Sequence, residues 1–96
     1  MKLHGSCGSV DVGPGYRFTD SDGMQWEIVR ETDSGIYSPV GVGGTNIVEC
    51  RHIGGEATNI WKRYLKGDLG EWCGDSLACA IIGHQSRALR RQGSGA

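Results

Sequence analysis

The cysteine and histidine side chains are the residues of this chain with the widest chemical scope, as metal ligands or as nucleophiles. The set is His4, Cys7, Cys50, His52, Cys73, Cys79 and His84. Protein zinc sites are usually built from Cys-x2–4-Cys and His-x3–5-His pairs. Here only mixed pairs occur, and Cys50-x-His52, on one face of an expected strand, is the best of them. A small zinc-binding protein, with Cys50, His52, Cys73 and Cys79 as a composed site, is therefore an alternative, whereas our first expectation is no bound metal and no cofactor.

Gly74-Asp75-Ser76-Leu77 spells the motif of a known esterase family. That chemistry requires a serine on an exposed turn and a histidine within hydrogen-bond reach. Ser76 instead falls on the apolar stripe of an expected helix, and His84 lies two turns further along, about 12 Å away along a helix axis. No other arrangement in the sequence resembles a catalytic site, so we predict no catalytic residues and no enzymatic activity.

Charge is distributed unevenly along the sequence. Residues 1–54 hold four basic and seven acidic side chains, residues 55–96 hold six and four, and the net charge of the chain is −1. Oppositely charged halves can orient a partner. The candidate binding residues are the cations of the second half and the acidic residues of an expected turn, namely Lys62, Arg63, Lys66, Arg87, Arg90, Arg91, Asp20 and Asp22.

Two classes of partner fit these charges. A nucleic-acid-binding accessory protein would use the basic helical face, but such domains are usually strongly basic and this chain is not. A host protein or protein complex is therefore the favoured partner, and nucleic acid is the alternative.

The length of 96 residues predicts one domain with one small core, spanning residues 1–96. We expect a loosely ordered start over residues 1–14 and a frayed tail over residues 92–96. The first residues lack the apolar stretch of a secretion signal, and no apolar run is long enough to span a bilayer. These features predict a cytoplasmic protein without a membrane partner, whose cysteines are thiols.

An Asp-Gly turn between two alternating segments is the strongest local signal in the sequence. Residues 15–19 and 24–31 are expected to pair as a β-hairpin around a loop of residues 21–23. With Gly23 in the left-handed conformation, Phe18 lies opposite Trp26 and Tyr16 opposite Ile28. This register places all four large side chains on one face.

The rest of the chain predicts further strands and then helices. Residues 36–42 form a weak strand and residues 45–53 a strong one, whose face carries Val48, Cys50 and His52. Thr58 is the expected N-cap of a short helix that stops before Gly67 and buries the face with Ile60, Trp61, Tyr64 and Leu65.

A second helix is expected over residues 68–91. Asp68 and Glu71 form an apparent capping box at its start, and Gly74 is a point where it could break and restart. The predicted fold class is α+β, a small antiparallel sheet of three or four strands followed by two C-terminal helices.

The hairpin sequence also resembles a group of known proteins. Gly15-Tyr16-x3-Asp20-x-Asp22-Gly23-x2-Trp26-x-Ile28-Val29 is similar to the opening of many small phage- and prophage-encoded accessory proteins. The resemblance implies a mobile-element protein that acts by binding, for example an inhibitor of a host defence complex such as an anti-CRISPR protein. It implies no functional residues. The sequence therefore predicts a small non-enzymatic interaction module that modulates or inhibits a host protein complex.

Overall fold

The computed structural model describes residues 1–32 and 47–94, with side chains up to Arg90. Its elements are β1 (Lys2–Gly5), β2 (Gly8–Asp11), β3 (Arg17–Thr19), β4 (Gln25–Thr32), β5 (Ile47–Gly54), α1 (Asn59–Tyr64), β6 (Leu69–Cys73) and α2 (Gly74–Ser94). The strands β1 and β2 form one antiparallel sheet, and a second antiparallel sheet has the order β3-β4-β5-β6. The predicted α+β class is confirmed, with one strand between the two helices.

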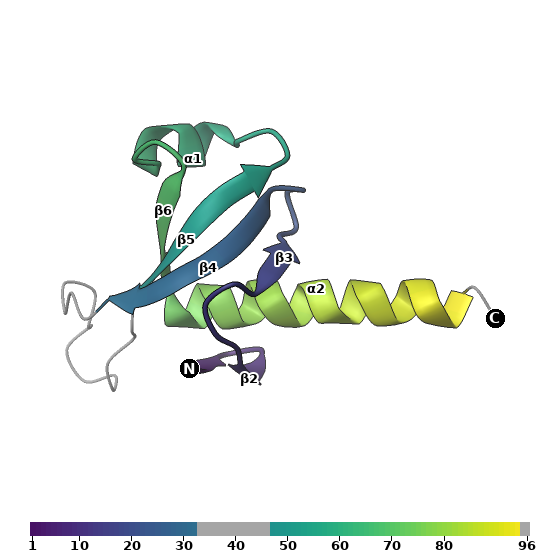
Figure 1. Cartoon of the computed structure of the whole chain (residues 1–96). Helices are drawn as coiled ribbons and strands as arrows, with labels where there is room; N and C mark the ends of the chain where they lie inside the picture. Colours follow the sequence, from purple (N-terminus) through teal and green to yellow (C-terminus); the bar gives the residue numbers. More distant parts are fainter. Residues whose placement is uncertain (33–46, 95–96) are drawn as a thin grey trace.

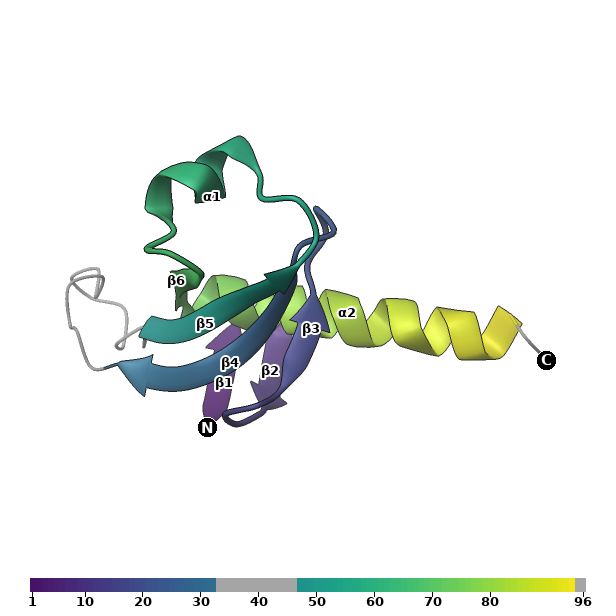
Figure 2. The same cartoon turned by 45° about the horizontal axis from the view of Figure 1, so that its top comes forward.

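The long helix α2 packs across the four-stranded sheet, and its C-terminal part extends beyond the strands (Figure 1). The β1–β2 hairpin packs against the first part of α2, while α1 contacts β6 at the other end of the sheet. Figure 2 shows α1 and the β1–β2 hairpin on opposite sides of the strands. Both helices contact β6, and α2 also contacts β3 and β5.

One face of the four-stranded sheet forms the core and the other faces solvent. Aromatic and aliphatic side chains from all four strands meet α2 and the N-terminal hairpin on the inner face, among them Phe18, Trp26, Ile28, Val48, Trp72, Leu3, Leu77 and Ile81. The outer face carries the ion pairs Arg17–Glu27 and Arg30–Glu49, at 3.0 and 3.5 Å. Such exposed pairs contribute little stability, so the inner face holds the fold together.

The β3–β4 hairpin has the register that the sequence predicts. Phe18 pairs with Trp26, and the Ile28 N–H donates to the Tyr16 carbonyl at 2.9 Å. Gly23 has a φ of 87°, the left-handed conformation that glycine adopts at no steric cost. Phe18, Trp26 and Ile28 are buried, and Tyr16 packs against the core from its edge. The hairpin prediction is confirmed.

Asp20 closes this turn from inside the protein. Asp20 is 6% exposed, and its carboxylate accepts hydrogen bonds from the Asp22 and Met24 backbone N–H groups, both at 2.9 Å. The second carboxylate oxygen accepts from Trp26 Nε1 at 3.0 Å. One side chain therefore fixes the turn and attaches it to the central tryptophan.

The first residues are more ordered than the sequence suggests. Residues 2–11 form the β1–β2 hairpin, Leu3 is buried, and the Val12 N–H donates to the Met1 carbonyl at 2.9 Å. Cys7, between the two strands, forms a disulfide with Cys79 in α2. The expectation of a loose start and of four free thiols is thus wrong for this segment, because a covalent bond and one buried leucine attach it to α2.

Residues 69–73 form a strand, so the predicted capping box at Asp68 and Glu71 is wrong. Gly70 and Trp72 face the core while Glu71 faces solvent, which is the alternation of a strand. In the sequence these residues also fit the longer apolar stripe of the helix that follows. The helix α2 begins at Gly74, the alternative that the sequence left open. Its cap is Cys73, whose Sγ accepts from the Ser76 N–H at 3.4 Å.

The remaining predictions are partly tested. Thr58 caps α1 as expected, since its Oγ1 accepts from the Trp61 N–H at 3.3 Å. The helix is shorter than predicted because it ends at Tyr64, and Gly67, with a φ of 65°, lies in the turn before β6.

The weak strand over residues 36–42 lies outside the described residues. The tail is helical as far as Ser94, beyond the expected end at residue 91.

The buried carboxylate predicts a large difference between two neighbouring acidic residues. Asp20→Ala removes three hydrogen bonds and leaves the Trp26 indole N–H without an acceptor, so we expect a loss of about 3 kcal/mol in the free energy of unfolding. Asp22→Ala, at an exposed position two residues further along the turn, should change it by less than about 0.5 kcal/mol. Urea unfolding of both variants measures this. Equal losses would show that Asp20 does not hold the turn.

The disulfide predicts a stability that depends on redox conditions. It joins residues 72 apart, and closing a loop of this size stabilises a protein by about 2–4 kcal/mol. Cys7→Ser should lose this amount in urea unfolding without reductant. Dithiothreitol should lower wild-type stability to the level of Cys7→Ser and leave the variant itself unchanged. Identical wild-type curves with and without reductant would contradict the contribution of the bond.

Candidate functional site

The helix α1 presents two large apolar side chains to solvent. Ile60 and Tyr64 are each 68% exposed, and a spacing of four residues places them on the same face of the helix. The sequence prediction that both are buried is wrong. Their exposure follows from the helix being anchored by its neighbouring residues, Trp61 and Leu65, which pack against the core.

Trp61 holds α1 on the sheet. Its ring lies 4.7 Å from that of Trp26 and 5.4 Å from that of Trp72, measured between centroids. The indole also lies over Gly70, where an added Cβ would be 2.8 Å from Trp61 Cζ3. A glycine at this position of β6 is therefore what lets the indole reach the core. A helix of six residues cannot be stable without such an anchor.

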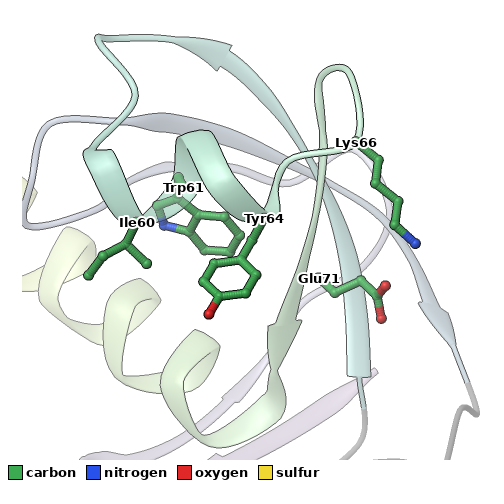
Figure 3. A pocket seen from close by; sticks show the side chains of 5 residues that line it. All are labelled: Ile60, Trp61, Tyr64, Lys66 and Glu71. Carbon is green, nitrogen blue, oxygen red and sulfur yellow. The ribbon is translucent and has the colours of Figure 1, made fainter.

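A groove of about 310 Å³ lies beside the exposed face of α1, lined by Ile60, Trp61, Tyr64, Lys66 and Glu71. Figure 3 shows Ile60 and Tyr64 projecting from α1, with Lys66 and Glu71 at the other end of the groove. Lys62 and Arg63 are exposed on the same helix. Within the described part of the chain, none of these three cations has an acidic side chain within ion-pair distance. The groove therefore combines apolar side chains with Lys66 and Glu71, and two further cations lie on the same helix.

The cations of α2 have other surroundings. Arg87 Nη2 donates to the Thr19 carbonyl at 2.7 Å, and His84 Nδ1 accepts from the Thr19 N–H at 3.2 Å. These two side chains bond the backbone N–H and carbonyl groups at the edge of β3, as a neighbouring strand would. Arg87 therefore stabilises the fold. Arg90 is exposed on α2, and the Arg91 side chain lies outside the described residues. The predicted basic residues are divided between two separate helices, α1 and α2 (Figure 1), and Arg87 is bonded to β3.

The two predicted acidic binding residues, Asp20 and Asp22, also differ in their surroundings. Asp20 is buried and fully used by the turn, whereas Asp22 is exposed at the hairpin tip. Asp22 lines a second cleft, between the hairpin tip and α2. Of the pair, only Asp22 is accessible to a partner.

The cysteine and histidine residues are dispersed over the structure. Cys79 is in the disulfide, Cys50 is buried in the core, and His52 Nε2 donates to the Gly55 carbonyl at 2.9 Å. Residues 1–32 and 47–94 contain no group of three or more His, Cys, Asp or Glu side chains arranged to hold a metal ion. The zinc alternative has no support in this part of the chain.

The esterase-like motif is not assembled into a triad. Ser76 is exposed in the first turn of α2, not buried as predicted, and its Oγ accepts from the Cys73 thiol at 3.1 Å. His84 is bonded to Thr19 on a later turn of the same helix. The arrangement around Ser76 is that of a helix cap.

Comparisons with protein-family models, with curated proteins and with solved structures found no match to this chain. No helix in the described part of the chain is both long and apolar enough to cross a bilayer. Function must therefore be inferred from the groove beside α1 and the cleft beside α2.

The two free cysteines should differ in reactivity. Burial, with a smaller effect of the Glu49 charge, raises the pKa of Cys50 from 9.0 to about 12, while Cys73 is half-buried. Iodoacetamide at about pH 8 should label Cys73 and leave Cys50 intact in the native protein, because the thiolate is the reactive form. Peptide mapping by mass spectrometry measures this, with guanidinium-unfolded protein as the positive control. Native labelling of Cys50 as fast as Cys73 would contradict it.

The same shift affects stability at high pH. Above the ordinary thiol pKa of 9.0, the unfolded chain loses the Cys50 proton while the native chain keeps it up to about pH 12. The unfolded state then binds fewer protons, so native stability falls as the pH rises through this range.

Proposed function

We propose that this protein is a small non-enzymatic protein-interaction module that contacts its partner through α1. The observation that supports this most is the exposure of Ile60 and Tyr64, at 68% each, on a helix held by another residue. Interfaces commonly place aromatic and aliphatic anchors at the centre and polar groups at the rim. Lys66 lies at the edge of the groove, and Lys62 and Arg63 add positive charge elsewhere on α1.

The charge of the groove favours an acidic partner. Among the described residues no ion pair joins Lys62, Arg63 or Lys66 to an acidic side chain, and Glu71 is the acidic side chain among the groove residues. A complementary surface would carry carboxylates around an apolar depression that receives Tyr64. Charge of this kind accelerates association and selects among partners more than it adds affinity.

The resemblance of the hairpin to phage and prophage accessory proteins supports a more specific proposal. The protein is encoded by a mobile element and modulates or inhibits a host protein complex, for example a defence complex. Inhibition of this kind requires only that a rigid surface covers the active or binding site of the partner. Trp61, packed between two other tryptophans, gives α1 that rigidity.

The predicted cytoplasmic location remains part of the proposal and has a structural consequence. Disulfides are rarely maintained in a reducing cytoplasm. A cytoplasmic form would hold the first hairpin through noncovalent contacts, such as the Ser6 N–H with the Asp75 carboxylate at 3.1 Å and the burial of Leu3. Neither Ser6, Asp75 nor Leu3 lines the groove beside α1.

A pull-down from nuclease-treated bacterial lysate tests the α1 surface. Tagged wild type is compared with Ile60→Ser/Tyr64→Ser and with the charge reversal Lys62→Glu/Arg63→Glu/Lys66→Glu, with mass-spectrometric readout. We expect one stoichiometric protein complex with wild type and at least a tenfold loss with each α1 variant, since interface anchors are worth about 1–2 kcal/mol or more.

Leu89→Ser/Arg90→Glu is the matched control, because it changes one exposed apolar and one exposed basic side chain on α2. This variant should retain the complex. A complex that survives both α1 variants would exclude the α1 surface. Loss of all partners on nuclease treatment, with recovery when nuclease is omitted, would favour the nucleic-acid alternative instead.

A further inference from the structure

The outer edge of β6 carries backbone groups that no other described strand uses, because β6 is the last strand of its sheet. The His52 N–H of β5 donates to the Asp68 carbonyl at 2.6 Å, so Asp68 directs its carbonyl toward β5. On the opposite side, Lys66 and Leu69 exchange two backbone hydrogen bonds, at 2.8 and 3.1 Å. Backbone direction alternates along a strand. Glu71, two residues after Leu69, therefore directs its N–H and carbonyl away from β5.

The groove beside α1 adjoins this edge. Glu71 lines it together with Ile60, Trp61 and Tyr64 (Figure 3). Trp61 lies over Gly70 on the inner face of the sheet, so the apolar side chains of α1 flank the inner side of the edge. The Glu71 side chain is exposed on the outer face. A chain segment along the edge would therefore contact apolar side chains on one side and a carboxylate on the other.

The outer face carries a row of charges that ends in two carboxylates. Arg30 of β4, Glu49 of β5 and Glu71 of β6 lie opposite one another in the register of the sheet. Arg30 Nε lies 3.5 Å from Glu49 Oε1, whereas no ion pair among the described residues includes Glu71. Like charges directly opposite each other destabilise a sheet. A cation on a further strand, opposite Glu71, would relieve this repulsion.

We propose that the partner adds an extended segment to β6 as an antiparallel strand, with a lysine or arginine opposite Glu71. The inference rests on the proposed interaction surface, because it states how the groove beside α1 is filled. Main-chain hydrogen bonds to Glu71 give affinity, and the side chains on either side of the edge give specificity. The residues before and after the cation point to the inner side, where Ile60, Trp61 and Tyr64 favour apolar side chains. The recognised pattern is apolar–basic–apolar.

The structure also limits the length of the added strand. Lys66 is bonded to Leu69 on this edge, so the segment cannot extend past Gly70 at one end. At the other end β6 stops at Cys73, where α2 begins. In an antiparallel arrangement, the residue that follows the segment lies on the side of Lys66. A carboxylate there agrees with a partner surface that is otherwise acidic.

The probe for this site is the peptide acetyl-Thr-Val-Lys-Val-amide, titrated into ¹⁵N-labelled protein. We expect saturable shifts of the Glu71 backbone N–H and of the Trp61 indole N–H signals. Hydrogen exchange of the Glu71 N–H should be fast in the free protein and slower in the complex, because it then donates to the peptide. The N–H groups of Gly70 and Trp72 point to β5 and should exchange slowly in both states.

Two control peptides separate main-chain pairing from charge. N-methylation of the lysine removes the donor to the Glu71 carbonyl and should weaken binding at least about fivefold. Glutamate in place of lysine adds a further carboxylate to the row and should weaken binding at least about threefold. The protein variant Glu71→Lys should reverse this preference and bind the glutamate peptide more tightly. Glu56→Lys, the same change of charge at an exposed position outside the groove, should keep the wild-type preference.

Three results would overturn the proposal. They are the absence of saturable shifts, equal affinity for the N-methylated peptide, and a preference for the lysine peptide that persists in Glu71→Lys. Thermal unfolding of each variant shows whether the sheet is intact, and the N-methylated peptide tests the pairing on the wild-type protein.

A pull-down with Glu71→Pro separates this inference from the α1 surface. Proline removes only a backbone N–H that the β5–β6 ladder does not use, which edge strands tolerate. We expect at least about a tenfold loss of the partner complex with Glu71→Pro, and a smaller loss with Glu71→Thr, which keeps the N–H. A complex that survives Glu71→Pro but not Ile60→Ser/Tyr64→Ser would exclude strand addition and retain the α1 surface. Survival in both variants would exclude both.

Discussion

The hydrogen bond between the Trp26 indole and the Asp20 carboxylate is the contact on which the rest of the structure depends. Asp20 uses its other oxygen to hold the hairpin turn, so the turn and the central tryptophan are positioned together. Trp26 is fully buried and contacts the rings of Trp61 and Trp72. Through these contacts one carboxylate sets the position of the hairpin tip, of α1 and of β6.

Gly70 provides the second constraint, because the two indoles packed over it leave no space for a side chain. An added Cβ would lie 2.8 Å from Trp61 and 3.1 Å from Trp26. Close packing of this kind turns a six-residue helix into a fixed part of the surface. It also explains why Ile60 and Tyr64 are exposed. Trp61 and Leu65 anchor α1 to the core, and they leave Ile60 and Tyr64 on the other side of the helix.

The sequence predicted those elements whose local and long-range signals agree. The β3–β4 hairpin is one, since its turn residues and its alternation indicate the same register, and the Thr58 cap of α1 is another. Strand β6 is not predicted, because Trp72 and Cys73 also fit the helical spacing of the apolar residues in α2, which begins directly after them. The disulfide could not be predicted, because its cysteines are 72 residues apart and no local spacing links them.

The candidate sites were harder to predict than the fold. Lys62, Arg63 and Lys66 were identified from charge alone, but the exposure of Ile60 and Tyr64 depends on where Trp61 finds space. Arg87 and Asp20 were selected for charge and instead complete the backbone of β3 and of the turn. A charged residue in the sequence does not show whether its partner is solvent, another molecule or the chain itself. The packing of neighbouring residues decides this.

Trp61 lines both the groove beside α1 and the acidic cleft beside α2. Trp61 is itself packed against Trp26 and Trp72, so the core fixes the position of an indole that both places share. The two surfaces carry opposite charge, so one partner could use both only with an acidic apolar region next to a basic one. Charge thus limits the orientation of a partner.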